Sequence, residues 1–151
     1  MGVRAVVFDV GNVLYHWSPR ALYQRLIPDD QALDAFLRDV VTPKWHFQHD
    51  AGRPFAETSA ELIAEHPEHR DLILLWGERF LESIIGPVAG MHELVAELDA
   101  AGVPIYGITN FSAEFWARFR VQETALFDRF GDVVVSGQER LTKPDPAIYA
   151  L

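Results

Sequence analysis

Hydrophobic residues along the chain form two kinds of pattern, short continuous runs and longer stretches with helical spacing. The first run, from Val3 to Leu14, is rich in β-branched residues and is broken by a single carboxylate, Asp9. Such a run suits a strand buried on both faces, as in a parallel sheet. Residues 103–108 and 132–136 are two further apolar runs, which predict a second and a third strand.

Helical spacing dominates between these runs. Over residues 16–85, leucine, valine and aromatic residues recur at helical intervals without convincing strands, and Pro28-Asp29-Asp30 predicts a turn before a new helix. A further helix is predicted from Met91 to Ala101, and another begins after Ser112, a candidate N-cap. Residues 147–151 are predicted to begin a last helix.

The order of these elements predicts the fold class. Strands that alternate with helices imply right-handed crossovers and a parallel sheet. Residues 16–85 are too many for one crossover, so we interpret them as an inserted α-helical cap. The prediction is an α/β protein with a parallel-sheet core at residues 1–15 and 86–151 and a helical cap at residues 16–85.

The composition is that of an ordinary globular protein, with 49% hydrophobic and 23% charged residues. The absence of cysteine excludes a disulfide framework, a thiolate metal site and a cysteine nucleophile. No apolar stretch is long enough to cross a membrane, and the first residues lack the features of a signal peptide. We therefore expect a cytoplasmic protein with no membrane partner.

The formal net charge of −9 argues against a nucleic-acid partner, because binding phosphate backbones requires a clustered basic face. The 13 lysines and arginines are scattered along the chain. A small anionic substrate is compatible with this charge, since one or two local cations and helix N-termini can hold it.

Polar side chains follow all three predicted strands. Asp9 comes at the end of the first, Thr109 and Asn110 at the end of the second, and Lys143 a few residues beyond the third. The carboxyl ends of parallel strands share one edge of the sheet, where α/β proteins bind ligands. Each residue alone has an ordinary interpretation, a turn or a surface lysine. Together they form a set suited to anion chemistry: a nucleophilic carboxylate, groups that hold oxygens, and a cation for developing charge.

Three segments around these residues resemble the first three motifs of the haloacid dehalogenase superfamily, in its branch with a helical cap after the first motif. They are Phe8-Asp9-Val10-Gly11-Asn12-Val13-Leu14, Ile108-Thr109-Asn110 and Lys143-Pro144-Asp145-Pro146-Ala147-Ile148-Tyr149. The resemblance implies a Rossmann-like core and a covalent aspartyl intermediate on Asp9. It also implies a Mg²⁺ ion held by the Asp9 carboxylate and the Gly11 carbonyl, with Asn12, Thr109 and Asn110 as substrate-binding candidates.

The chain departs from the family pattern at position 11. Phosphatases of the family usually have a second aspartate there as general acid and base, whereas this chain has Gly11. Loss of a positioned acid typically costs about 10²- to 10⁴-fold in rate, and it matters less for a leaving group such as the anomeric oxygen of a sugar 1-phosphate. The resemblance to a bacterial group that includes sugar-1-phosphate phosphatases agrees with this. The favoured function is a Mg²⁺-dependent phosphatase of a small phosphorylated metabolite such as a sugar phosphate.

The fourth motif of the family, an acidic pair, is expected beyond Leu151. Without it, Mg²⁺ has one side-chain ligand and one carbonyl, a poor site for a hard cation that prefers six oxygens. Weak Mg²⁺ binding and slow turnover are therefore expected of these 151 residues, as of a fragment of a longer protein.

Two other functions remain open. A 2-haloacid dehalogenase also attacks through an aspartate but needs neither a metal nor a proton donor, because halide leaves unprotonated. It is expected to use a cap arginine, for which Arg38 is the candidate, and to have an aromatic residue where this chain has Gly11. The other alternative is a non-catalytic binding protein that retains the fold.

The cap contains the residues expected to select the substrate. Trp45, His46, His49 and Asp50 precede Gly52 in what we predict to be a loop facing the core site. Trp45 is interpreted either as cap core or as a substrate-binding aromatic residue. The pairs His46/His49 and His66/His69 have metal-ligand spacing without a firm third ligand, so surface histidines are favoured. Exposed apolar surface beside a missing C-terminal segment would favour a homodimer.

Overall fold

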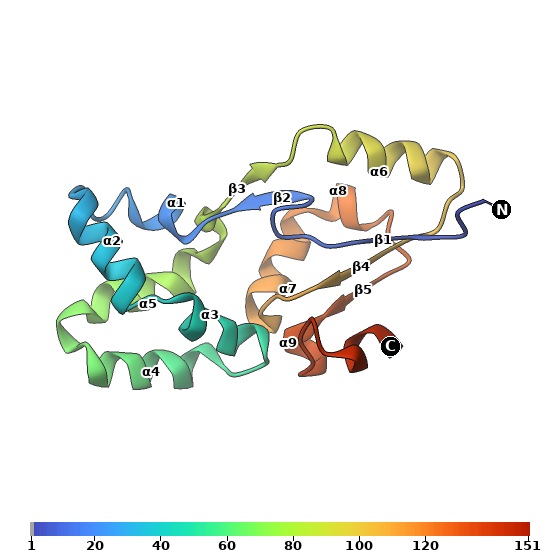
Figure 1. The fold of residues 1–151 in the computed structure, drawn as a ribbon. Coiled ribbons are helices and arrows are strands. Elements are labelled where there is room, and N and C mark those ends of the chain that lie inside the picture. The colour runs from blue at the N-terminus through green and yellow to red at the C-terminus, as the bar shows by residue number, and fades with distance from the viewer. Residues whose placement is uncertain (1) are drawn as a thin grey trace.

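The computed structural model describes residues 2–151, and its main sheet is parallel. The strands are β1 (Val6–Phe8), β4 (Ile105–Thr109) and β5 (Asp132–Val135). Their order is β1-β4-β5, and Phe8 lies opposite Gly107 in the register of the first pair (Figure 1). The predicted α/β class with a parallel sheet is confirmed, and each strand lies within or close to one of the apolar runs.

The helices of the core follow the strands in the predicted order. They are α6 (Met91–Ala100), α7 (Ala113–Gln122), α8 (Thr124–Phe127), α9 (Ser136–Glu139) and the 3₁₀ helix η3 (Pro146–Ala150). Ser112 is the N-cap of α7, and its hydroxyl accepts a 3.4 Å hydrogen bond from the Phe115 N–H. The predicted helices α6 and α7 are thus confirmed, whereas the segment at residues 146–150 is a 3₁₀ rather than an α-helix.

One face of the sheet is buried and the other is open. Phe8 and Ile105 belong to the hydrophobic core together with Val95 of α6. On the opposite face, Val7 is 56% exposed and its register partner Tyr106 is 40% exposed. The expectation that the first strand is buried on both faces is therefore wrong, because the described helices bury the Phe8 side and leave the Val7 side open.

A short antiparallel ribbon connects the core to the cap. It pairs β2 (Tyr15–Trp17) with β3 (Ile84–Pro87), so that the chain leaves the core along one strand and returns along the other. Sequence spacing did not predict this ribbon, because each strand is very short and its partner lies far away along the chain. The predicted cap boundaries at residues 15/16 and 85/86 both fall inside the ribbon, and the division into two domains stays a prediction.

The segment between the two ribbon strands is helical. It contains α1 (Pro19–Tyr23), α2 (Asp30–Asp39), α3 (Pro43–Asp50), α4 (Phe55–Glu65), η1 (Pro67–His69), α5 (Arg70–Arg79) and η2 (Phe80–Ser83). In Figure 1 these helices lie together on one side of the ribbon, and the parallel sheet lies on the other. Their interior is aromatic: the buried rings of Tyr23 and Trp76 stack 5.9 Å apart, and Phe36 meets Tyr23 edge to face.

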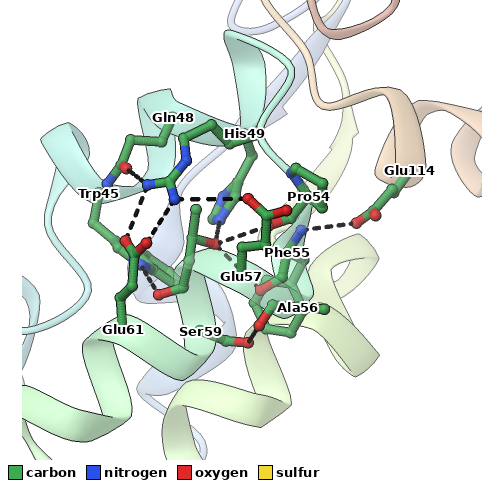
Figure 2. Close-up of polar contacts among 12 residues, drawn as sticks. Trp45, Gln48, His49, Pro54, Phe55, Ala56, Glu57, Ser59, Glu61 and Glu114 are labelled. Atoms are coloured by element: carbon green, nitrogen blue, oxygen red, sulfur yellow. Dashed lines mark hydrogen bonds and ion pairs between the residues drawn. The ribbon is translucent and has the colours of Figure 1, made fainter.

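Polar contacts join α3 to α4 and α4 to the core (Figure 2). The Arg53 guanidinium, just after α3, pairs with Glu61 at 2.7 Å and with Glu57 at 3.7 Å, both on α4. At the start of α4, the Phe55 N–H donates a 3.3 Å hydrogen bond to a Glu114 carboxylate oxygen on α7. The cap helices are therefore tied to one another and to the core helix that follows Asn110.

Among residues 2–151, none of the helices combines the length and apolar character needed to cross a membrane.

Candidate active site

Asp9 follows directly after β1 and forms an ion pair with Lys143. The distance between the Asp9 Oδ2 and Lys143 Nζ atoms is 2.6 Å, and their side chains are 42% and 19% exposed. The other carboxylate oxygen, Oδ1, accepts a 2.7 Å hydrogen bond from the Val10 N–H. The carboxylate is thus held at the end of the strand by a backbone donor and a cation, while part of it faces solvent.

Asn110 fixes the segment that carries Lys143. Its Oδ1 accepts a 2.8 Å hydrogen bond from the Lys143 N–H, and its Nδ2 donates a 3.1 Å hydrogen bond to the Lys143 carbonyl. Thr109, the preceding residue, ends β4 opposite Val135 and is buried. Asp9, Asn110 and Lys143 are therefore brought together at one edge of the sheet. The substrate-binding roles of Thr109 and Asn110 stay predictions, and the Asn110 amide is engaged with the Lys143 backbone.

A tight turn separates Asp9 from the ribbon. The Val10 carbonyl accepts hydrogen bonds from the backbone N–H groups of Val13, Leu14 and Tyr15. Asn12 has a positive φ of 57°, and its Oδ1 accepts a 2.9 Å hydrogen bond from the Trp17 N–H. Asn12 thereby closes the turn between β1 and β2, and its role in substrate binding stays a prediction.

Gly11 leaves open space beside Asp9. A Cβ atom built at this position would meet no atom within 4 Å. Its carbonyl accepts none of the backbone hydrogen bonds found outside regular elements in residues 2–151. Position 11 thus offers a free oxygen and room for a ligand.

The predicted donors for a metal are the Asp9 carboxylate and the Gly11 carbonyl. Both are the hard oxygen donors that Mg²⁺ prefers, and Mg²⁺ commonly keeps several waters and uses only one or two carboxylates. Within the described residues there is no group of three or more acidic, histidine or cysteine side chains placed to hold a metal. The residues present fit Mg²⁺ in kind, with few protein ligands.

A cavity of about 80 Å³ lies between the cap and this edge of the sheet. Most of its lining is aromatic or aliphatic, and the polar exceptions come from α3 and from Asn110. The lining residues are Val10, Gly11, Tyr15, Trp17, His46, Asp50, Phe80, Ile84, Asn110, Phe111 and Phe119. Tyr15 and Trp17 had not been singled out from the sequence. Their alternation with the exposed His16 is the sequence pattern that could have indicated a short strand with Tyr15 and Trp17 on its inner face.

The residues before Gly52 form the helix α3, not the loop predicted from the sequence. His46 and Asp50 do line the cavity, and both are buried. Burial lowers the pKa of His46 to about 3 and that of His49 to about 4, while it raises the pKa of Asp50 to about 7. The prediction of surface histidines is therefore wrong for His46 and His49, because stacking on Phe80 and a 2.6 Å hydrogen bond to Thr58 hold them inside.

The two remaining substrate-binding candidates of the cap lie away from the cavity lining. Trp45 is buried, its Nε1 donates a 3.1 Å hydrogen bond to the Thr58 carbonyl, and its ring packs edge to face on His49. The Arg38 side chain is 69% exposed and pairs with the neighbouring Asp39 at 2.6 Å. Trp45 thus has the packing of a cap-core residue and Arg38 that of a surface residue. Their roles in substrate binding stay predictions.

Known proteins with related sequences or folds were compared with the chain. A sesquiterpene phosphatase, astK of Aspergillus oryzae, is 26% identical over 152 residues, which cover 97% of this chain and 70% of that protein. A haloacid dehalogenase family enzyme of Bacteroides thetaiotaomicron, solved with magnesium and inorganic phosphate, superposes with a TM-score of 0.66 at 16% identity, over 99% of this chain and 76% of that one. The L-2-haloacid dehalogenase of Xanthobacter autotrophicus, with chloropropionic acid covalently bound, superposes with a TM-score of 0.61 at 19% identity. The match covers 99% of this chain and 63% of the dehalogenase.

The two structural likenesses, at such low identity, establish a shared fold. The family assignment comes from the sequence itself. Residues 3–151 match the family described as haloacid dehalogenase-like hydrolases, nearly the whole chain. The chain therefore belongs to the haloacid dehalogenase-like hydrolases.

Proposed function

We propose that this hydrolase is a phosphatase that transfers the phosphoryl group of a small monophosphate ester to Asp9 and then to water. The observation that carries the proposal is the 2.6 Å contact between the Asp9 carboxylate and the Lys143 ammonium, beside the open position of Gly11. A carboxylate next to a fixed cation can attack phosphorus while the cation balances charge that develops on the phosphoryl oxygens.

The proposed reaction has two steps. In the first, one Asp9 oxygen forms a bond to phosphorus and the bond between phosphorus and the ester oxygen breaks. In the second, water attacks the phosphorus of the aspartyl phosphate and restores the carboxylate. Asn110 keeps Lys143 in place through both steps by its two hydrogen bonds to the Lys143 backbone.

The Asp9 carboxylate and the Gly11 carbonyl are the residues that would hold Mg²⁺. When bound, the ion would supply positive charge that draws the phosphate to Asp9 and stabilises the transition state. The magnesium and phosphate in the Bacteroides enzyme, which shares the fold, support this part of the proposal.

The cavity suggests which esters are suitable. Its wall contains Trp17, Phe80 and Phe111 but few groups that can hydrogen-bond a polyol. Such a lining favours an apolar alcohol portion over a sugar, because burying sugar hydroxyls without partners is costly. The similarity to a sesquiterpene phosphatase supports the same choice. We therefore propose a phosphate ester of a small apolar alcohol as the substrate class, in place of the sugar phosphate suggested by the sequence.

The test is a comparison of substrates with and without Mg²⁺. Phosphate release is measured from a short prenyl phosphate and from glucose 1-phosphate, and halide release from 2-chloropropionate. The proposal expects phosphate release from the prenyl ester, lost on chelation of Mg²⁺. Metal-independent chloride release would instead identify a dehalogenase. Turnover of none of these compounds, with no beryllium fluoride adduct on Asp9, would favour a non-catalytic protein.

Replacement of the nucleophile is the first prediction. Asp9→Asn removes the attacking carboxylate and should lower kcat at least about 10³-fold. Asp71→Asn is a matched control, because that side chain is 93% exposed on α5 in the cap. Mass spectrometry of the intact protein should detect a phosphoryl adduct in the control and none in Asp9→Asn. An active Asp9→Asn variant would contradict the proposed nucleophile.

A further inference from the structure

We propose that Asp50, at the end of the cap helix α3, donates the proton to the leaving group and later accepts one from the attacking water. This inference rests on the proposed phosphatase function. An alcohol leaving as an alkoxide needs a proton, and position 11 is a glycine that cannot supply it. Asp50 and Gly11 line the same cavity, and a Cβ atom at Gly11 would meet no atom within 4 Å.

The end of α3 is anchored to the segment after β4, which contains Asn110 and is hydrogen-bonded to Lys143. The Asp50 carbonyl accepts a 2.6 Å hydrogen bond from the Ser136 hydroxyl, whose oxygen accepts a 2.9 Å hydrogen bond from the Phe111 N–H. Phe111 directly follows Asn110, which is bonded to Lys143. The main chain of Asp50 is therefore tied, through three hydrogen bonds, to the same framework as the Asp9–Lys143 pair.

The Asp50 carboxyl group also has an unused oxygen. Its Oδ1 atom is buried and has no hydrogen-bond partner among the described residues. His46 Nε2 lies 3.6 Å from this oxygen, which is too long for a hydrogen bond. A carboxyl group with a purely structural role is expected to have both oxygens satisfied. An unpartnered oxygen on a residue that lines the cavity instead suits a contact with a ligand.

Burial makes this carboxyl group titrate near neutral pH, so that part of it is protonated there. Burial raises the pKa of Asp50 to about 7, against the smaller opposite effect of a hydrogen bond from the Ser112 backbone. His46 stays neutral beside it, because burial lowers its pKa to about 3. The other titratable residue of the lining is Tyr15, whose hydroxyl donates to Glu123 at 2.6 Å. Within the described lining, no lysine or arginine stabilises the ionised form of Asp50.

The proton balance closes over the two steps. As the bond between phosphorus and the ester oxygen breaks, the Asp50 carboxylic acid transfers its proton to that oxygen, and the alcohol leaves neutral. Water then forms a bond to the phosphorus of the aspartyl phosphate, the bond between phosphorus and the Asp9 oxygen breaks, and one of the two water protons passes to the Asp50 carboxylate. Inorganic phosphate departs, and both aspartates return to their starting states.

The test uses two esters that differ in the need for a proton. p-Nitrophenolate leaves without protonation, whereas a simple alkoxide does not. Asp50→Asn keeps the size of the side chain but cannot act as an acid. It should lower kcat/KM for an alkyl phosphate by about 10²- to 10⁴-fold and that for p-nitrophenyl phosphate by less than about tenfold. Asp71→Asn, exposed on α5, should leave both values unchanged.

The outcomes separate this inference from the proposed function. An equal loss on both esters in a folded Asp50→Asn variant would make Asp50 structural and overturn the inference, while Asp9→Asn still abolishes both reactions. If Asp50→Asn does not fold, the inference is tested instead by the kinetics of the unaltered protein. Its kcat/KM should change little across esters of increasing alcohol pKa, and a steep dependence would overturn the inference. A protein that cleaves no ester at all contradicts the phosphatase proposal and this inference together.

Discussion

Asn110 is a residue whose side chain acts on another residue's backbone. Both of its polar atoms are bonded to the Lys143 backbone, so it holds the segment whose side chain pairs with Asp9. A displacement of about 1 Å in a positioned group can reduce a rate about 10²-fold. In the proposed reaction Asn110 is therefore a positioning residue, while Lys143 contacts the phosphoryl group.

Replacement of Asn110 tests this interpretation. Asn110→Ala should lower kcat about 10- to 100-fold, because Lys143 loses its two backbone restraints. Lys143→Ala should cost more, since the charge itself is removed. Steady-state kinetics on the prenyl phosphate separates the two cases. A loss in Asn110→Ala confined to KM would show instead that the amide binds substrate directly.

The buried Asp50 carboxyl group also predicts how stability depends on pH. Its folded pKa of about 7 lies above the ordinary value of 3.8. Between these two values the folded state keeps a proton that the unfolded state has released, so this stabilisation is complete below pH 3.8 and is lost as pH rises through 7. The group contributes a slope of at most about 1.4 kcal/mol per pH unit.

The Asp50→Asn variant isolates this contribution. The unfolding free energy of the variant, relative to the unaltered chain, should increase as pH rises from 5 to 8, because only the unaltered chain must bury a carboxylate at high pH. Urea denaturation at several pH values measures the difference. A difference independent of pH would mean that Asp50 titrates normally in the fold. The buried histidines act equally in both chains and cancel.

At the scale of elements, the joint between cap and core depends on close backbone approach. A Cβ atom at Gly137 in α9 would lie 2.5 Å from the Ala113 nitrogen and 2.7 Å from the Phe111 carbonyl oxygen. These backbone atoms belong to the segment that starts α7. Only a glycine lets α9 lie this close, with Ser136 reaching both Phe111 and the end of α3.

Gly137→Ala should therefore destabilise the fold by about 1–3 kcal/mol, since backbone atoms cannot move aside as a flexible side chain can. Gly11→Ala is the matched control, because a Cβ there meets nothing within 4 Å. Thermal denaturation of the two variants measures the contrast. Equal melting temperatures would contradict the close contact at α9.

Sequence patterns predict elements where the cause is local. The sequence predicts the strand before Asp9, the N-cap at Ser112 and the turn before α2. In each case the residues that cause the structure act on their own neighbours: β-branched residues in the strand, the capping hydroxyl of Ser112, and Asp29 in the turn. The convergence of Asp9 with Lys143 was predicted from parallel topology. The β2–β3 ribbon was missed because its pairing is long-range.

The burial of individual side chains by tertiary packing also could not be predicted from the sequence. Spacing alone gave no reason for His46 to stack on Phe80, or for His49 to lie 5.8 Å from the ring of Phe115. The cavity function of Trp17 and the backbone role of Asn110 depend on the same kind of contact, between segments far apart in the chain. Sequence reasoning thus predicted that Asp9 and Lys143 lie together, and it missed most of the cavity wall beside them.

At the scale of the whole molecule, the net charge and the proposed substrate have the same sign. The chain has a formal net charge of −9, while the proposed substrate is an anion. Lys143 beside Asp9 offers a local cation in a mostly buried position, where screening by salt is weaker than at the surface. In the proposed reaction, the local charge of Lys143 would therefore hold the phosphate, while the net negative charge opposes binding of polyanions such as nucleic acids.

The same negative charge bears on the predicted homodimer. The open face of the sheet exposes Val7 and Tyr106, which favours association, while like charges on two copies oppose it. If this face joins two copies, the mean mass by light scattering should rise with protein concentration, and more steeply at 0.5 M than at 0.05 M salt, because salt screens the repulsion. Tyr106→Lys adds a charge to the exposed face and should prevent the rise. A monomeric mass under all these conditions would contradict the dimer, and association unaffected by Tyr106→Lys would assign it to another surface.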